Sequence, residues 1–293
     1  MPKLHLIDAT YELFRAYFAV PNERAPGGEE VGAIRGLTSS VLALLHQEEV
    51  THVAAATDHV IESFRNDLFD GYKTGEGVPE DLMAQFPLAE DALRALGVVV
   101  WPMIEFEADD ALATAAARFA VQVDQVVILS PDKDLCQCVR DGRVVTYDRR
   151  REKTYDTQGV IDKFGVVPES IPDLLALVGD NADGYPGIPG WGMKSAAAVL
   201  RAYGTIEAIP DDVTSWTCAV RGAVKLAATL AERRADALLY KRLAILRTDV
   251  PLRETLDDLE WRGVRRQQYE AMCERFGFGE LATRPKRWDA ERE

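Results

Sequence analysis

The sequence lacks the features of a membrane-embedded, secreted or zinc-binding protein. No apolar run approaches the roughly 18 residues that a membrane-spanning helix needs, and residues 1–10 show no signal-peptide pattern. The spacing of the four cysteines matches neither a zinc site nor a redox Cys-x-x-Cys pair. The four histidines show no metal-ligand or catalytic-triad spacing. We therefore expect a cytoplasmic protein with reduced thiols, no membrane contact and no nucleophile that histidine activates.

Positive charge is also scarce. The chain has 34 lysines and arginines against 48 aspartates and glutamates, and its formal net charge is -14. Non-specific affinity for nucleic acid comes from neutralising phosphates, so any DNA contact would depend on a few local basic stripes. The apolar content of 47% is ordinary for a globular protein, and 293 residues suffice for one large α/β domain with a helical appendage.

Three short apolar runs each lead into aspartate. These are Leu4 to Ile7 before Asp8, Val53 to Thr57 before Asp58, and Val126 to Leu129 before the loop with Asp132 and Asp134. Continuous runs rich in valine, isoleucine and leucine, separated by helical stretches, are typical of buried parallel strands. Because open parallel sheets bind their ligands at the carboxyl ends of the strands, we expect these carboxylates to converge.

Five further acidic residues extend this set to nine. Glu107, Asp109 and Asp110 open an alanine-rich helix, and Asp180 and Asp183 lie in a glycine-containing turn. Two like charges about 4 Å apart repel by roughly 4 kcal/mol at an effective dielectric of about 20, so nine carboxylates in one cleft require cations. Oxygen ligands without histidine or cysteine favour Mg²⁺ or Mn²⁺. The chemistry this implies is phosphoryl transfer to water.

Each acidic residue also has a simpler interpretation. An aspartate at the end of a strand often only caps a helix or a turn, and Asp109 and Asp110 would also complement a helix dipole. Repeated use of the same position at three strand ends favours metal ligation over capping.

Other segments show helical or extended patterns. We predict helices at residues 11–18, 31–49, 88–96, 173–178, 194–203 and 221–246, and further strands at 98–101 and 143–147. Between residues 59 and 86 the pattern breaks down around several glycines and a proline, which indicates a mobile excursion next to Asp58. Because of their place in this excursion, Arg65 and Lys73 are predicted to contact substrate.

A glycine-rich hairpin lies between two of the predicted helices. Gly190 and Gly192 precede a helix that opens with Lys194 and Ser195. Backbone N–H groups at such a helix N-terminus form an anion site, for which a DNA phosphate is the natural ligand. Arg221 and Lys225 are predicted as further DNA contacts, although their positions also suit a solvated helix face.

Taken together, these motifs resemble the bacterial 5' nuclease family, in a free-standing form of the domain at the amino end of DNA polymerase I. The resemblance covers nearly the whole chain. It is carried by Ile7-Asp8, Arg15-Ala16-Tyr17, Phe64-Arg65, Tyr72-Lys73, Glu107-Ala108-Asp109-Asp110, Asp132-Lys133-Asp134, Gly179-Asp180, Pro189-Gly190-Trp191-Gly192 and Arg247-Thr248-Asp249.

The resemblance implies a fold and a division of the chain. The fold is an α/β, mostly parallel sheet flanked by helices, with a helical arch and a helix-hairpin-helix module. The nuclease domain is expected at residues 1–160 with the arch at about 59–86, the DNA-binding module at 161–250 and a helical extension at 251–293.

The resemblance also implies roles. All nine acidic residues would bind two or three Mg²⁺ or Mn²⁺ ions, Lys73 would approach the scissile phosphate, Arg15 would lie at the cleft floor, and Arg65 and Tyr72 would belong to the DNA-contacting set. A monovalent cation is expected at the hairpin. The implied activity is 5'-flap endonuclease and 5'-3' exonuclease cleavage of DNA at flaps, nicks and free 5' ends, and its substrates would extend to RNA primer segments. The enzyme would act as a monomer in replication and repair.

Two departures and two alternatives accompany this interpretation. Glu76 lies where relatives usually carry a cation, and bulky Trp191 occupies the hairpin, where it either wedges against sugar or packs. The first alternative is a phosphatase of the haloacid dehalogenase type, which would use Asp8. That family requires a second acid two residues later, and position 10 here is threonine. The other alternative is a non-catalytic protein that binds branched DNA.

Overall fold

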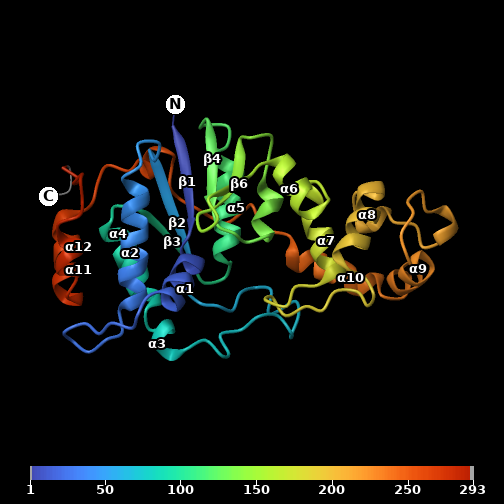
Figure 1. The fold of residues 1–293 in the computed structure, drawn as a ribbon, viewed down its shortest axis with the longest axis horizontal. Helices are drawn as coiled ribbons and strands as arrows, with labels where there is room; N and C mark the ends of the chain where they lie inside the picture. Colours follow the sequence, from blue (N-terminus) through green and yellow to red (C-terminus); the bar gives the residue numbers. More distant parts are fainter. Residues whose placement is uncertain (1, 291–293) are drawn as a thin grey trace. The chain divides into compact units, whose positions relative to one another are not determined.

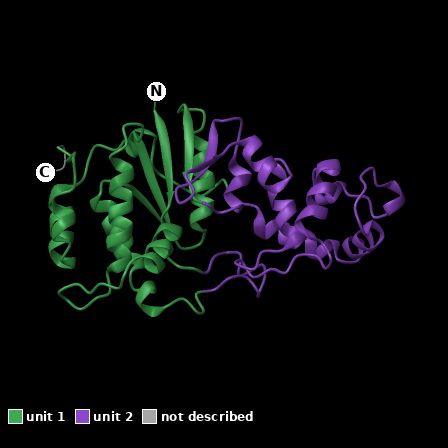
Figure 2. Ribbon diagram, viewed as in Figure 1, with its two compact units in different colours: residues 1–61, 75–130, 248–293 green, residues 62–74, 131–247 purple. Residues whose placement is uncertain are grey.

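The structure is a computed structural model that describes residues 2–290 and consists of two compact units (Figure 2). Unit 1 contains residues 1–61, 75–130 and 248–293, and unit 2 contains residues 62–74 and 131–247. Both units are therefore assembled from segments that are far apart in the sequence. All four cysteines are free thiols.

Unit 1 is built on four parallel strands in the order β3-β2-β1-β4 (Figure 1). They are β1 (Lys3–Asp8), β2 (His52–Asp58), β3 (Val99–Met103) and β4 (Gln125–Leu129). In the register, Asp8 pairs with Ala56 of β2, and Ile7 pairs with Leu129 of β4. The predicted parallel sheet is confirmed, and its central strand β1 is almost completely buried because it lies between two strands and helices α1 (Ala9–Ala19) and α5 (Ala108–Phe119) pack against it.

Two helices of unit 1, those that follow β1 and β3, begin at acidic caps. The helices of this unit are α1 (Ala9–Ala19), α2 (Gly32–Leu45), α3 (Glu80–Met83), α4 (Phe86–Ala95), α5 (Ala108–Phe119), α11 (Arg266–Phe276) and α12 (Gly279–Ala282). The Asp8 carboxylate caps α1, and Glu107 with Asp110 forms a reciprocal capping box on α5. Helix α5 packs against β1, β2 and β3, so its acidic first turn is tied to the sheet.

Unit 2 combines a short antiparallel pair of strands with a helical core. The strands are β5 (Val144–Asp148) and β6 (Lys153–Tyr155), and the helices are α6 (Thr157–Phe164), α7 (Ile171–Val178), α8 (Met193–Tyr203), α9 (Ala223–Glu232) and α10 (Arg234–Ala244). Its core includes the completely buried Leu174, Leu177 and Tyr185. Helix α7 packs against both α8 and α10, so it is the centre of the unit.

One predicted helix is divided in two. The sequence pattern predicts a single helix over 221–246, whereas the structure has α9 and α10 with a break at Arg233, whose backbone angles are φ -114° and ψ 25°. The Arg233 side chain donates to Asp236 at 2.7 Å within the new first turn. No glycine or proline marks the break, so local signals could not predict it.

The excursion between Asp58 and α4 consists mostly of turns. Within residues 59–86 only α3 and the first residue of α4 are helical, so the predicted helical arch is largely non-helical here. Gly71, Gly75 and Gly77 interrupt the segment, and Gly77 adopts a positive φ of 85°. None of the helices among residues 2–290 has the length and hydrophobicity that a membrane crossing requires.

Candidate metal centre

Asp8 occupies the carboxyl end of β1 and makes two different hydrogen bonds. Its Oδ1 accepts from the Tyr11 backbone N–H at 2.9 Å, and its Oδ2 accepts from the Ser130 hydroxyl at 2.7 Å. Both Asp8 and Ser130 are buried. Ser130 directly follows β4, so the neighbouring strand fixes the orientation of this carboxylate.

Asp58 connects β2 to the start of α5. Its backbone N–H donates to the Thr10 hydroxyl at 2.8 Å, and its Oδ1 accepts from the Ala108 backbone N–H at 2.7 Å. The same first turn holds Glu107, whose N–H donates to Asp110 Oδ2 at 3.0 Å. The structure thus brings Asp58 to the positive end of the α5 dipole, where the helix also carries Asp109 and Asp110.

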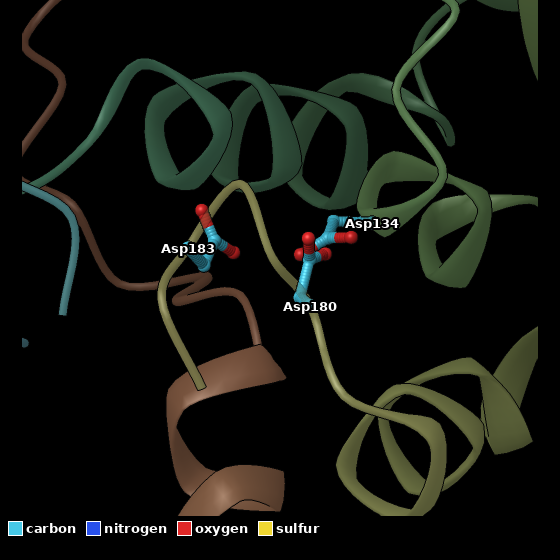
Figure 3. A group of neighbouring side chains, drawn as sticks. All are labelled: Asp134, Asp180 and Asp183. Carbon is cyan, nitrogen blue, oxygen red and sulfur yellow. The ribbon is translucent and has the colours of Figure 1, made fainter. Parts of the chain in front are cut away.

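In unit 2, Asp134, Asp180 and Asp183 form a close cluster. Each offers one carboxylate oxygen within 4.8 Å of the others, and Figure 3 shows the carboxylates facing one another. Asp134 begins the short 3-10 segment after Lys133, whereas Asp180 and Asp183 lie in the turn after α7.

The turn that carries Asp180 and Asp183 is tightly held. Asp180 exchanges two backbone hydrogen bonds with Tyr185, at 2.8 and 3.1 Å. Gly184 has a φ of 86°, and a Cβ at this position would lie 2.1 Å from the Gly71 carbonyl oxygen. Glycine is therefore required here by both conformation and space.

The electrostatics of this cluster favour a cation. Burial raises the pKa of Asp134 well above its usual range, and the neighbouring Asp132 and Asp183 raise it further. Among the described residues, Asp134 Oδ1 is buried without a hydrogen-bond partner. An oxygen left in this state is costly unless a cation binds it, so the residues fit a divalent metal ion.

Two lysines partly balance these acids. Lys133 Nζ contacts Asp180 Oδ2 and lies 4.0 Å from Asp134 Oδ1, while Lys73 Nζ lies 3.6 Å from Asp183 Oδ1. Although burial lowers the pKa of Lys133, its acidic neighbours raise it on balance, so the lysine stays charged. Asp132 is exposed, and its Oδ1 accepts from the Asp134 backbone N–H at 2.9 Å.

The hairpin before α8 leaves the predicted anion-binding groups exposed. Gly190, Gly192 and Lys194 are exposed, and Ser195 exchanges hydrogen bonds with the backbone of Gly192. Trp191 points the other way. The residue is 5% exposed and its Nε1 donates to the Leu226 carbonyl at 3.2 Å, so this side chain packs in the core.

Other predicted nucleic-acid contacts have different surroundings. Arg221 and Lys225 are exposed at the start of α9. Arg65 is only 1% exposed, and its guanidinium donates to the carbonyls of Leu243 and Ile245, at 2.8 and 3.1 Å. Tyr72 is likewise buried, in the core of unit 2. The burial of Arg65 and Tyr72 indicates a role in folding and does not support the prediction that they contact DNA.

Arg15 also has surroundings that the sequence did not indicate. Its Nη2 donates to Glu12 Oε2 at 2.5 Å and to the Ser40 hydroxyl at 2.9 Å. Ser130, Thr10 and Lys133 contact the acidic residues here but were not predicted as site residues from the sequence. The signal for Ser130 was its position after a strand, which is the same signal that identified Asp8.

Comparison with known proteins identifies the family. The chain matches the model of the 5'-3' exonuclease N-terminal resolvase-like domain over residues 3–165. It matches the 5'-3' exonuclease C-terminal SAM fold over residues 166–267. This chain belongs to the 5'-3' exonuclease family. The predicted family and enzyme class are confirmed.

Relatives of this exonuclease-family chain include DNA polymerase I from two genera. It is 36% identical to DNA polymerase I of Bacillus caldotenax over 94% of this chain and 31% of the relative. The identity to DNA polymerase I of Mycobacterium leprae is 35%, over 97% of this chain and 31% of the relative. The chain therefore spans about a third of the length of these relatives.

Solved structures confirm the predicted fold class. The bacteriophage T5 flap endonuclease, in a pseudo-enzyme-product complex with DNA and metal ions, has a TM-score of 0.65 and 19% identity over 83% of this chain and 88% of that chain. The catalytic core of Rad2, in complex with a DNA substrate, has a TM-score of 0.62 and 15% identity over 94% of this chain and 87% of that chain. At these identities the likeness shows the fold alone.

Proposed function

We propose that this 5'-3' exonuclease-family chain is a divalent-metal-dependent, structure-specific 5' nuclease. Its substrates would be DNA flaps, nicks and free 5' ends in replication and repair, and its products would carry a 5' phosphate. The observation that carries the proposal is the cluster of Asp134, Asp180 and Asp183, with its buried and unsatisfied carboxylate oxygen. The T5 flap endonuclease and the Rad2 catalytic core, both solved in complex with DNA, support the choice of substrate.

In this proposal the carboxylates of each unit bind metal ions. Bound Mg²⁺ or Mn²⁺ would activate water and stabilise charge on the phosphoryl oxygens. The ligands would be Asp8, Asp58, Glu107, Asp109 and Asp110 in unit 1, and Asp132, Asp134, Asp180 and Asp183 in unit 2. Lys73, whose ammonium already lies beside Asp183, would offset negative charge on the scissile phosphate.

The DNA backbone would be bound by groups that do not read sequence. The exposed hairpin of Gly190 and Gly192, with Lys194 and Ser195, offers backbone N–H groups and a cation to one phosphate. Arg221 and Lys225 would contact further phosphates. Such contacts position a duplex without selecting bases, so cleavage would follow the structure of the substrate. A monovalent cation at the hairpin and a monomeric state belong to the same proposal.

The test is cleavage of a labelled 5'-flap duplex in Mg²⁺. The wild-type chain should release flap products, and Asp109→Ala should abolish cleavage while flap binding remains measurable. Asp91→Ala is the matched control, because Asp91 is an exposed acid on α4 that pairs with Arg94. Turnover of Asp109→Ala at the wild-type rate would refute the ligand assignment.

A second substrate separates the alternatives. Hydrolysis of a generic phosphomonoester without flap cleavage would indicate a phosphatase, and flap binding without any hydrolysis would indicate a scaffold. Product lengths divide the two nuclease activities, because a ladder of short fragments from a blunt duplex means exonucleolytic cutting.

A further inference from the structure

A pocket of about 370 Å³ in unit 1 is lined by arginine and serine. It lies between α1, α2 and the residues around α12, and its polar wall consists of Arg15, Arg35, Ser39, Ser40 and Arg284. None of the described residues that line it is acidic. This is unusual for a chain with a formal net charge of -14.

The guanidinium groups converge on one turn of α2. Arg15 Nη2 donates to the Ser40 hydroxyl at 2.9 Å, and Arg284 Nη1 donates to the Ser39 hydroxyl at 3.1 Å. Ser39 and Ser40 are consecutive, so the two guanidinium groups flank the same part of the helix. Arg35 lies four residues before Ser39 and therefore on the same helix face.

The wall behind these groups is rigid. A Cβ at Gly36 would lie 2.7 Å from Val20 Cγ2 and 2.9 Å from Ala16 Cβ. Glycine at this position thus allows α1 and α2 to pack closely, which fixes the separation of the helices that carry Arg15 and Arg35. The pocket is therefore formed largely by two closely packed helices.

The arginines keep donor groups for a ligand. Arg35 pairs with Glu23 and Glu280, and Arg15 pairs with the buried Glu12. A guanidinium has five N–H donors, so these pairs leave several N–H groups for an oxyanion.

We propose that this pocket binds a phosphate group of a nucleotide or of a nucleic-acid strand. Guanidinium forks bind phosphate oxygens through paired, charge-assisted hydrogen bonds. The volume is larger than a lone phosphate needs and falls in the range of about 300–1,000 Å³ that is typical of small-ligand sites. This binding goes beyond the proposed nuclease reaction, because it uses no carboxylate of the metal set and requires no divalent ion.

The test measures binding by the full chain in EDTA, where no metal-dependent cleavage occurs. The probes are thymidine 5'-monophosphate, thymidine without the phosphate, and a blunt fluorescent duplex. We expect the phosphate-bearing probes to bind and thymidine not to bind. Arg284→Gln and Arg35→Gln should each weaken binding by about tenfold or more, the scale expected when a hydrogen bond to a charged group is lost. Arg275→Gln should not change it, because Arg275 is an exposed arginine of α11 outside the pocket.

The outcomes identify the source of the phosphate. Loss of mononucleotide binding in the two variants assigns the pocket to free nucleotides, and loss of duplex binding alone assigns it to a strand. Unchanged affinity of both variants for both phosphate probes would overturn the proposal. Failure of the nuclease proposal would be seen separately, as absent flap cleavage by the wild-type chain in Mg²⁺.

Discussion

The carboxylates of unit 1 are held individually, whereas those of unit 2 face one another. Asp8 and Asp58 accept hydrogen bonds from helix N-termini, and Asp8 also accepts one from a hydroxyl group. In unit 2, Asp134, Asp180 and the half-buried Asp183 lie within one cluster, and two lysines pair with its acids.

This difference shows that acids proposed for one chemistry can have opposite effects on folding. In unit 1, capping bonds and helix dipoles stabilise the charged form, so these acids contribute to stability as well as to metal binding. In unit 2 the like charges repel at short distance, so the cluster opposes folding until a cation binds. Capping and metal ligation are therefore compatible roles for Asp8.

The largest expected effect is on catalysis in unit 2. Asp183→Asn should lower flap cleavage by about a thousandfold, the scale expected when a group that supports charge in the transition state is removed. Its free energy of unfolding without metal should stay the same or rise, because a mutual repulsion is removed. Cleavage rates and urea denaturation in EDTA measure the two effects, with the exposed Asp162→Asn as control. A marked loss of stability would show that the cluster is structural.

The next effect is the response of unit 1 to acid. Burial, together with the charge on Lys3, lowers the pKa of His5 in β1 to about 4. The unfolded chain takes up this proton near pH 6.5 but the folded chain does not, so stability falls as pH drops from about 6.5 towards 4, by about 3 kcal/mol in total. Urea denaturation across this range should show the slope.

His5→Val checks the assignment. This variant keeps a β-forming residue in β1, and its unfolding free energy should depend less on pH between about 4 and 6.5. If both proteins lose stability equally over this range, the acid sensitivity arises elsewhere.

A smaller effect is expected for the hydroxyl that orients Asp8. Ser130→Ala should raise the Mg²⁺ or Mn²⁺ concentration needed for half-maximal cleavage by about 10- to 100-fold, since groups that orient metal ligands contribute on this scale. Metal titration of the cleavage rate measures it. Ser170→Ala removes a different buried serine, which donates to the Gly204 carbonyl, and should leave the metal requirement unchanged.

The smallest effect separates capping from ligation at Asp8. Asparagine is a good helix cap and alanine is not, so Asp8→Ala should be less stable than Asp8→Asn by about 1 kcal/mol. Both variants should lose cleavage, because neither supplies a carboxylate. Equal stability of the two, measured by urea denaturation, would mean that the Asp8 cap adds nothing to folding.

The sequence by itself identified the family and five of the six strands in the part of the chain that the structure describes, and it missed only the short β6. An apolar run that ends in aspartate is a local pattern, because all its residues are neighbours in the chain. Such runs are typical of parallel strands, so Asp8 and Asp58 were correctly placed at strand ends. The glycine-rich hairpin and the helix after it were also local patterns, and α8 begins within one residue of the prediction.

Only the tertiary structure decided the roles of individual polar side chains. Arg65 is buried because its guanidinium satisfies carbonyls 178 and 180 residues further along the chain, and no local pattern encodes such a contact. The same applies to Ser130, which orients Asp8 from 122 residues away, and to the arginines that meet on α2. Periodicity predicts which face of an element is buried, but the partner of a charged group depends on which distant segments pack beside it.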